Sequence, residues 1–96
     1  MTKQAPPKHR LINTSKSADD FLSTLPPKQF KQVFTKVWDL RANPRPHDSI
    51  KLTGFDDKYR TDIGEYSIIY TFNDTIVNIE AIGKRNDGDV YKKNKR

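Results

Sequence analysis

EYSIIYTFNDTIVNIEAI, residues 65–82, is the stretch that decides the fold. Its two halves, residues 65–72 and 75–82, are rich in Ile, Val and Tyr, which favour β-strands. Asn73-Asp74 between them is typical of a two-residue hairpin loop. The stretch therefore predicts an antiparallel hairpin in the second half of the chain.

Such a loop also predicts which side chains share a face of the hairpin, because side chains alternate along a strand. We expect the face turned toward the core to carry Tyr66, Ile68, Tyr70 and Phe72 opposite Ala81, Ile79, Val77 and Thr75. We expect the other face to carry Ser67, Ile69 and Thr71 opposite Glu80, Asn78 and Ile76. The second set mixes polar and apolar side chains, so we expect this face to stay open to water or to a ligand.

A short helix is predicted ahead of the hairpin. Ser17 followed at the third position by Asp20 resembles a capping box, with Asp in place of Glu. We expect this helix to run from Ala18 to about Leu25. Pro26-Pro27 ends it and can begin the next helix, because proline is tolerated in the first turn of a helix.

The strongest helical pattern follows this proline pair. Apolar side chains recur at positions i, i+3, i+4, i+7 and i+8, as Phe30, Val33, Phe34, Val37 and Trp38. We expect this second helix to end by Ala42 or Asn43, because the residue before a proline such as Pro44 avoids helical geometry.

Shorter strands complete the predicted fold. Residues 9–14 form a first strand candidate, and residues 51–54 and 58–63 are weaker ones. The order strand, helix, helix and then strands predicts an α+β domain. In it, two N-terminal helices pack on one face of a small, mostly antiparallel sheet, and a basic tail follows.

Length and charge bound the organisation of the chain. Its 96 residues suffice for one domain, which we assign to residues 9–91, between a flexible arm over residues 1–8 and a basic tail over residues 92–96. The 18 Lys and Arg against 12 Asp and Glu give a net charge of +6. Residues 83–96 supply +4 of it, from six Lys and Arg against two Asp. Such a charge favours a nucleic acid or an acidic protein as partner.

Several function classes have no support in the sequence. The chain has no cysteine, which excludes a disulfide scaffold and a thiol nucleophile. Its only histidines, His9 and His47, lie far apart and without ligand spacing, so we predict neither a metal nor a cofactor. No apolar run approaches the roughly 20 residues that span a bilayer, and no signal peptide opens the chain, so we expect a cytoplasmic protein without a membrane partner.

Cations and tyrosines remain as candidate functional groups. The interleaved residues are Lys51, Lys58, Tyr59, Arg60, Tyr66, Lys84, Arg85 and Tyr91. Basic groups mixed with aromatic rings suit phosphate contact combined with base stacking. The alternative is that these basic residues only solvate a small domain.

An ordered set of short motifs resembles a known family. The motifs are Asn43-Pro44-x-Pro46, Lys51-Leu52-x-Gly54, Tyr59-Arg60, Gly64-Glu65-Tyr66-x-Ile68-Ile69-Tyr70, Gly83-Lys84-Arg85 and Asp89-Val90-Tyr91. Together they resemble the RelE/ParE superfamily of bacterial toxin–antitoxin toxins. Gly-Lys-Arg followed six residues after the Arg by Tyr is similar to the RelE branch, whose members cut mRNA in the ribosomal A site.

This resemblance implies a RelE-like fold and a metal-independent endoribonuclease, an mRNA interferase of bacterial type. Its partners would be the ribosome, mRNA and a neutralising antitoxin. By resemblance, Arg85 stabilises the transition-state phosphate, Tyr91 stacks on a base or acts as the base, and Arg60 is a third catalytic residue. The residues expected to bind RNA are Lys84, Lys51, Lys92 and Lys93.

Two positions depart from the family's pattern. Ser67 stands where RelE-type toxins usually have Arg, and Asp62 stands where a second basic residue often follows Arg60. A hydroxyl cannot replace the charge or the donors of a guanidinium. The chain is then a weakened or altered nuclease, a toxin disarmed by substitution, or a relative with another target. The rival functions are a ParE-like gyrase inhibitor and a basic RNA-binding domain without cleavage activity.

Overall fold

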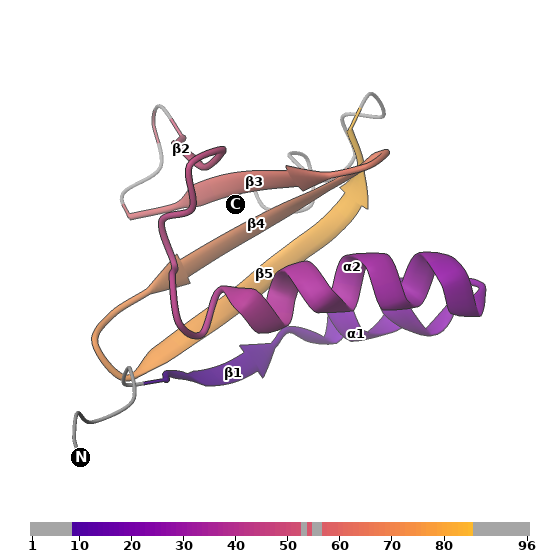
Figure 1. Cartoon of the computed structure of the whole chain (residues 1–96), viewed down its shortest axis with the longest axis horizontal. Helices are drawn as coiled ribbons and strands as arrows, with labels where there is room; N and C mark the ends of the chain where they lie inside the picture. The colour runs from indigo at the N-terminus through magenta and orange to yellow at the C-terminus, as the bar shows by residue number, and fades with distance from the viewer. Residues whose placement is uncertain (1–8, 53, 55–56, 86–96) are drawn as a thin grey trace, which may run out of the picture.

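The chain is built on one five-stranded sheet, and the computed structural model describes residues 9–52, 54 and 57–85. In chain order the elements are β1 (Leu11–Thr14), α1 (Lys16–Ser23), α2 (Pro27–Asp39), β2 (Ile50–Lys51), β3 (Tyr59–Ile63), β4 (Tyr66–Phe72) and β5 (Ile76–Lys84). The strands lie in the order β1-β5-β4-β3-β2, with β1 parallel to β5 and the other pairs antiparallel (Figure 1). The predicted α+β class and mostly antiparallel sheet are confirmed.

Both helices pack on the same face of the sheet, as predicted (Figure 1). The buried core between the two layers consists of Ala18, Leu22, Val33, Val37, Leu40, Tyr66, Ile68, Tyr70, Val77, Ile79 and Ile82. Ile68, Val77 and Ile79 are fully buried. Burial of each such side chain stabilises the fold by about 1.5–3 kcal/mol. The core therefore fixes the helices to the central strands β4 and β5.

The start of α1 differs from the prediction. Ser15, and not Ser17, caps the helix, because its Oγ accepts a hydrogen bond from the Ala18 amide at 3.0 Å. The Ser15 amide also donates to the Ile79 carbonyl at 2.9 Å, which continues the pairing of β1 with β5. The chain thus passes from strand to cap in one residue, and the helix begins at Lys16, two residues earlier than Ala18.

The second helix begins as predicted and ends within the predicted limit. Pro27 occupies the first turn, and the helix ends at Asp39, ahead of the limit at Ala42 or Asn43. After Asp39 the amides of Arg41 and Ala42 bond three residues back, to Trp38 and Asp39, which tightens the last turn.

The predicted pairing of β4 with β5 is wrong near the turn. The loop contains three residues, 73–75, because the Asn73 side chain accepts bonds from the amides of Thr75 and Ile76 at 2.8 and 3.0 Å. Phe72 therefore pairs with Val77 and not with Thr75, and Tyr70 pairs with Ile79. The pairing moves by two residues, which leaves these side chains on their predicted face.

A β-bulge then changes the faces farther along the same strands. The register shifts between Ile69 and Tyr70, so that Glu80 is the extra residue of β5. Beyond it Ile69 pairs with Ala81 and Ser67 with Gly83. The predictions that Ala81 shares the face of Tyr66 and that Ser67 lies opposite Glu80 are therefore wrong.

The face of the sheet opposite the helices is less open than predicted. Ile69 and Ala81 are buried there, and Leu52 packs against them. Leu52 follows β2, which contains only Ile50–Lys51 and is shorter than the predicted strand over residues 51–54. Ser67 is also buried. This face is therefore covered at its centre and polar at both ends. Ser67 and Asp62 lie at one end, and Thr71, Asn78 and Asn13 lie at the other.

The outer segments of the predicted organisation lie outside the described residues. This applies to the arm over residues 1–8, the tail over residues 92–96 and Tyr91. The boundaries of the domain therefore stay predictions. Among the described residues, neither helix is long and apolar enough to cross a membrane.

Candidate active site

An open hollow lies on the sheet face opposite the helices, beside the turn between β3 and β4. Its lining residues are Arg60, Asp62, Gly64, Glu65, Ser67 and Arg85. Arg60 and Asp62 come from β3, and Ser67 comes from β4, where it pairs directly with Asp62. Because strand residues two apart share a face, β3 presents both its arginine and its carboxylate to the hollow.

The β3–β4 turn has a backbone conformation that favours glycine at its first loop position. Ile63 pairs with Tyr66, which leaves Gly64 and Glu65 as a two-residue loop. Gly64 has a φ of +58°, a conformation that disfavours other residues. A Cβ at this position would also lie 2.8 Å from Nε2 of Gln32 on α2. The positive φ therefore favours glycine here, and any other side chain would also require the Gln32 side chain to move.

The same turn positions Arg85, which follows β5. The Arg85 amide donates to the Glu65 carbonyl at 2.8 Å, and its Nη1 donates to the Gly64 carbonyl at 3.3 Å. The bulge in β5 contributes, because it places Gly83 opposite Ser67 and carries the strand on to Lys84. Arg85 thereby reaches the turn, and its side chain is 56% exposed.

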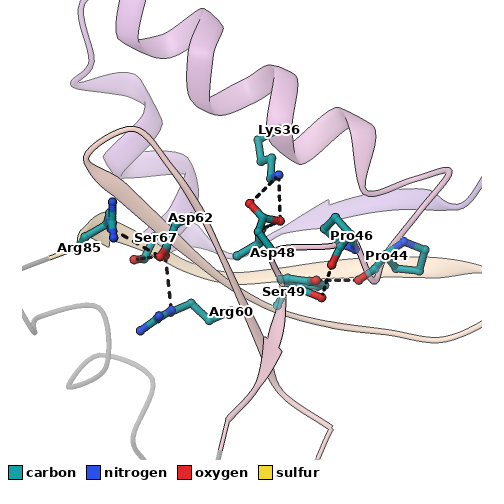
Figure 2. A network of polar contacts seen from close by, with 11 residues as sticks. Lys36, Pro44, Pro46, Asp48, Ser49, Arg60, Asp62, Ser67 and Arg85 are labelled. Carbon is teal, nitrogen blue, oxygen red and sulfur yellow. Dashed lines mark hydrogen bonds and ion pairs between the residues drawn. The ribbon is translucent and has the colours of Figure 1, made fainter.

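Asp62 lies at the centre of the polar contacts in the hollow (Figure 2). Its Oδ1 is 3.4 Å from Nε of Arg60 and accepts a hydrogen bond from Oγ of Ser67 at 2.7 Å. Its Oδ2 is 3.5 Å from Nε of Arg85. Two guanidinium groups, one from β3 and one from the residue after β5, thus converge on one carboxylate. Guanidinium groups arranged in this way can also bind the oxygens of a phosphate.

A second polar network lies on the helix-covered side of the sheet (Figure 2). Nζ of Lys36 on α2 donates to both oxygens of Asp48 at 3.1 and 3.2 Å, and Oγ1 of Thr61 donates to Asp48 at 3.0 Å. Partial burial raises the pKa of Asp48, but the bonds from Lys36 and Thr61 outweigh it, so the pKa lies below its ordinary value. This network fastens the loop before β2 to α2.

Tyr70 belongs to the same side and is excluded as a proton acceptor. Burial raises its pKa to about 12. Its hydroxyl donates to the Pro44 carbonyl at 2.6 Å. A hydroxyl that stays protonated and bonded to the backbone has a structural role, here holding the loop after α2 against the sheet.

The structure brings together four of the residues singled out from the sequence, Arg60, Asp62, Ser67 and Arg85. Lys84 does not join them, because it pairs with Tyr66, whose ring belongs to the helix-covered core. Lys51 likewise pairs with Tyr59, which packs against that core. Tyr91, Lys92 and Lys93 lie outside the described residues.

Sequence reasoning did not identify two features of this face, the β3–β4 turn and the ion pair between Lys58 and Glu80. Gly64 and Glu65 line the hollow through the β3–β4 turn, which a glycine between two strand candidates could have indicated. Lys58 and Glu80 form an ion pair of 3.5 Å. The spacing of Lys58, Arg60 and Asp62 at every second position could have placed all three on one face. In the described ranges, no group of three or more His, Asp or Glu gathers that could hold a metal ion.

Comparison with known proteins supports this picture of the fold. No protein-family model matches the chain, and no curated protein matches its sequence. The archaeal RelE–RelB complex from Pyrococcus horikoshii contains a similar structure, with 27% identity, 82% of this chain and 98% of that chain covered, and a TM-score of 0.71.

Two further solved structures have the same fold. The toxin–antitoxin complex RelBE2 from Mycobacterium tuberculosis is 22% identical over 80% of this chain and 99% of that chain, with a TM-score of 0.70. A variant of the E. coli toxin RelE in the free state is 21% identical over 88% of this chain and 93% of that chain, with a TM-score of 0.73. The resemblance is confirmed at the level of the fold: the chain has a RelE-like fold, similar to that of RelE toxins in these solved structures.

Proposed function

We propose that the protein is the toxin of a type II toxin–antitoxin system and that it cleaves mRNA on the ribosome. The observation that carries this proposal is the convergence of Arg60 and Arg85 in an open hollow of a RelE-like fold. Solved structures with this fold include toxins bound to RelB antitoxins. A small protein with a charge of +6 also fits a polyanionic substrate.

RNA cleavage without a metal needs three things of this site. The 2′-oxygen must lose its proton and attack phosphorus, the five-coordinate phosphorus must be stabilised, and the 5′-oxygen must take a proton as its bond to phosphorus breaks. Arg85, which is more exposed than Arg60, is proposed to stabilise the negative charge on the phosphoryl oxygens. Arg60 would hold the same phosphate from the other side of the hollow. Tyr91 is proposed to stack on a base or to accept the 2′ proton.

The antitoxin is proposed to be a protein that supplies negative charge to this cationic chain. Its association should slow as salt rises, because salt screens attraction between opposite charges. An association rate that does not change between low and high salt would remove the electrostatic part of this proposal.

The test uses purified ribosomes programmed with a defined mRNA, in a buffer whose salt concentrations match those of a bacterial cytoplasm. After incubation with the protein, new mRNA 5′ ends are mapped by primer extension. We expect new ends only when ribosomes are present, and none with Arg85→Ala. Lys31→Ala, which removes one exposed positive charge on α2, is the matched control and should cleave like the parent.

Absence of new ends with the parent protein would contradict the nuclease assignment. A gyrase supercoiling assay on the same preparation would then separate the two rival functions. Inhibition of supercoiling would support a ParE-like gyrase inhibitor. Lack of both activities, together with binding of RNA, would support an RNA-binding domain without cleavage activity.

A further inference from the structure

Asp62 occupies the position in the hollow where the two arginine side chains meet. Each of its oxygens is near a different guanidinium, Oδ1 near Arg60 and Oδ2 near Arg85. A carboxylate and a phosphate both present two negatively charged oxygens to such donors. The carboxylate therefore takes the place that a bound phosphate needs.

The charges around the hollow support this competition. Among the described residues, the lining contains two arginines, Arg60 and Arg85, and two carboxylates, Asp62 and Glu65, so the formal charges of these residues cancel. A phosphodiester carries one negative charge and gains little long-range attraction from a neutral site. Full attraction from the arginines requires Asp62 to move away from them or to lose its charge.

The contact distances indicate that Asp62 can be exchanged. Its distances to the Nε atoms of Arg60 and Arg85 are 3.4 and 3.5 Å, longer than the roughly 2.7–2.9 Å of a strong charge-assisted bond. The short bond is the one from Ser67, at 2.7 Å, and Ser67 is 1% exposed. Ser67 thus fixes the carboxylate, whereas the contacts of the carboxylate with the two arginines are longer.

We propose that Asp62 is an internal counterion of this site, positioned by Ser67, which an incoming RNA phosphate must displace from Arg60 and Arg85. The proposal rests on the proposed function for the identity of the phosphate as part of RNA. The proposal gives Asp62 and Ser67, the two residues that depart from the family's pattern, a single shared role, because they pair directly across β3 and β4. Its effect is to lower the affinity of the site for phosphate.

The experiment measures phosphate binding to the isolated protein, without ribosomes. The probes are inorganic phosphate and a short single-stranded DNA, which cannot be cleaved through a 2′-hydroxyl. Binding at low salt is followed by the ¹⁵Nε resonances of Arg60 and Arg85. Asp62→Asn keeps the size of the side chain and an acceptor for Ser67, and it should bind both probes about tenfold more tightly than the parent.

Two matched variants distinguish the effect of the position of Asp62 from the effect of removing one negative charge from the protein. Glu80→Gln removes the same charge from the carboxylate that pairs with Lys58, and Glu80 does not line the hollow. It should change the affinity less than about twofold. Glu65→Gln removes a charge from the rim without touching the ion pairs of Asp62 and should lie between the two. Equal affinities for Asp62→Asn and Glu80→Gln would overturn the proposal.

A measurement on the parent protein gives a second test that needs no variant. Titration with phosphate should shift the ¹³C resonance of the Asp62 carboxylate together with the Nε resonances of both arginines. Shifts of the arginines without a shift of Asp62 would overturn displacement. Because both tests omit ribosomes, tighter phosphate binding by Asp62→Asn without mRNA cleavage by any variant would support the counterion and contradict only the proposed function.

Discussion

Asp48 and Asp62 have the same kinds of partners, but they lie on opposite faces of the sheet, Asp48 on the side of the helices and Asp62 in the open hollow (Figure 2). Each carboxylate accepts a hydrogen bond from a buried hydroxyl, of Thr61 or Ser67, and each lies near a basic side chain. Asp48 bonds to Lys36 at 3.1 and 3.2 Å on the side of the helices. Asp62 lies 3.4 and 3.5 Å from two arginines in an open hollow.

The difference teaches what each network is for. The Asp48 network joins three parts of the fold: α2, β3 and the loop that precedes β2. Breaking this network therefore loosens the contacts between these elements. The Asp62 network joins neighbouring strands that backbone bonds already hold together, and its cations are accessible to a ligand. We therefore expect changes around Asp48 to affect stability and changes around Asp62 to affect activity.

The largest expected effect is the loss of cleavage in Arg85→Ala. Removing one preorganised donor to a transition-state oxyanion commonly costs a factor of about 10²–10³ in rate. We expect a loss of that size in single-turnover cleavage on programmed ribosomes, with a melting temperature like that of the parent. Lys36→Ala should show the reverse pattern, a lower melting temperature and a parent-like rate. A shared loss of both properties in either variant would contradict the division between the two networks.

The next effect is a gain of cleavage in Ser67→Arg. The new guanidinium would enter the hollow opposite Gly83, neutralise Asp62 and supply a third cation near the phosphate. We expect the cleavage rate to rise by at least about tenfold, which needs about 1.4 kcal/mol of transition-state stabilisation. A preorganised donor commonly supplies more than that, about 2.7–4 kcal/mol. Ser67→Gln, of similar length and without charge, is the control. A rate for Ser67→Arg no higher than for Ser67→Gln would show that the missing arginine does not limit the site.

A smaller effect is expected on stability from Asp48→Ala. The change leaves the hydroxyl of fully buried Thr61 and the ammonium of Lys36 without this acceptor. We expect the free energy of unfolding to fall by about 1 kcal/mol, since part of the network is exposed to solvent. Urea denaturation measures it. Asp62→Asn should change stability by less than about 0.5 kcal/mol, and a larger loss there than in Asp48→Ala would reverse the comparison.

The smallest effect is the pH dependence of the Asp48 contribution. The pKa of Asp48 in the folded protein lies below its ordinary value of 3.8. A lowered folded-state pKa means that the contribution is fully present above pH 3.8 and is lost as the pH falls through the folded-state pKa. The stability difference between the parent and Asp48→Asn should therefore be constant from pH 7 to pH 5 and narrow below pH 3.8. A difference that widens on acidification would contradict this sign.

The fold could be read from the sequence where local pattern decides the structure. The Ile, Val and Tyr of residues 65–72 and 75–82 gave two strands, and the apolar stripe from Phe30 to Trp38 gave α2 with its proline start. Val33 and Val37 of this stripe are buried, whereas Phe30 and Trp38 are 40% and 47% exposed. Periodicity thus identifies the helix but not which edge of its stripe the core covers.

The register of β4 and β5 could not be predicted, because long-range bonds determine it. The bulge at Glu80 is held by Oγ of Ser15, which donates to the Glu80 carbonyl at 2.8 Å from the far end of β1. A sequence window around the hairpin does not contain this partner. The resemblance to the family's motifs singled out the unusual residues Asp62 and Ser67 separately. Their pairing follows only when Gly64 and Glu65 are recognised as a two-residue turn.

The most direct test of the central claim is a cleavage cycle on programmed ribosomes with four proteins. They are the parent, Asp62→Asn, Arg85→Ala and the protein carrying both changes. If Arg85 acts on a phosphate for which Asp62 competes, Asp62→Asn should cleave faster than the parent. Both proteins with Ala at position 85 should cleave about 10²–10³-fold more slowly than the parent. Cleavage by Arg85→Ala at the parent rate, or by none of the four proteins, would contradict the account.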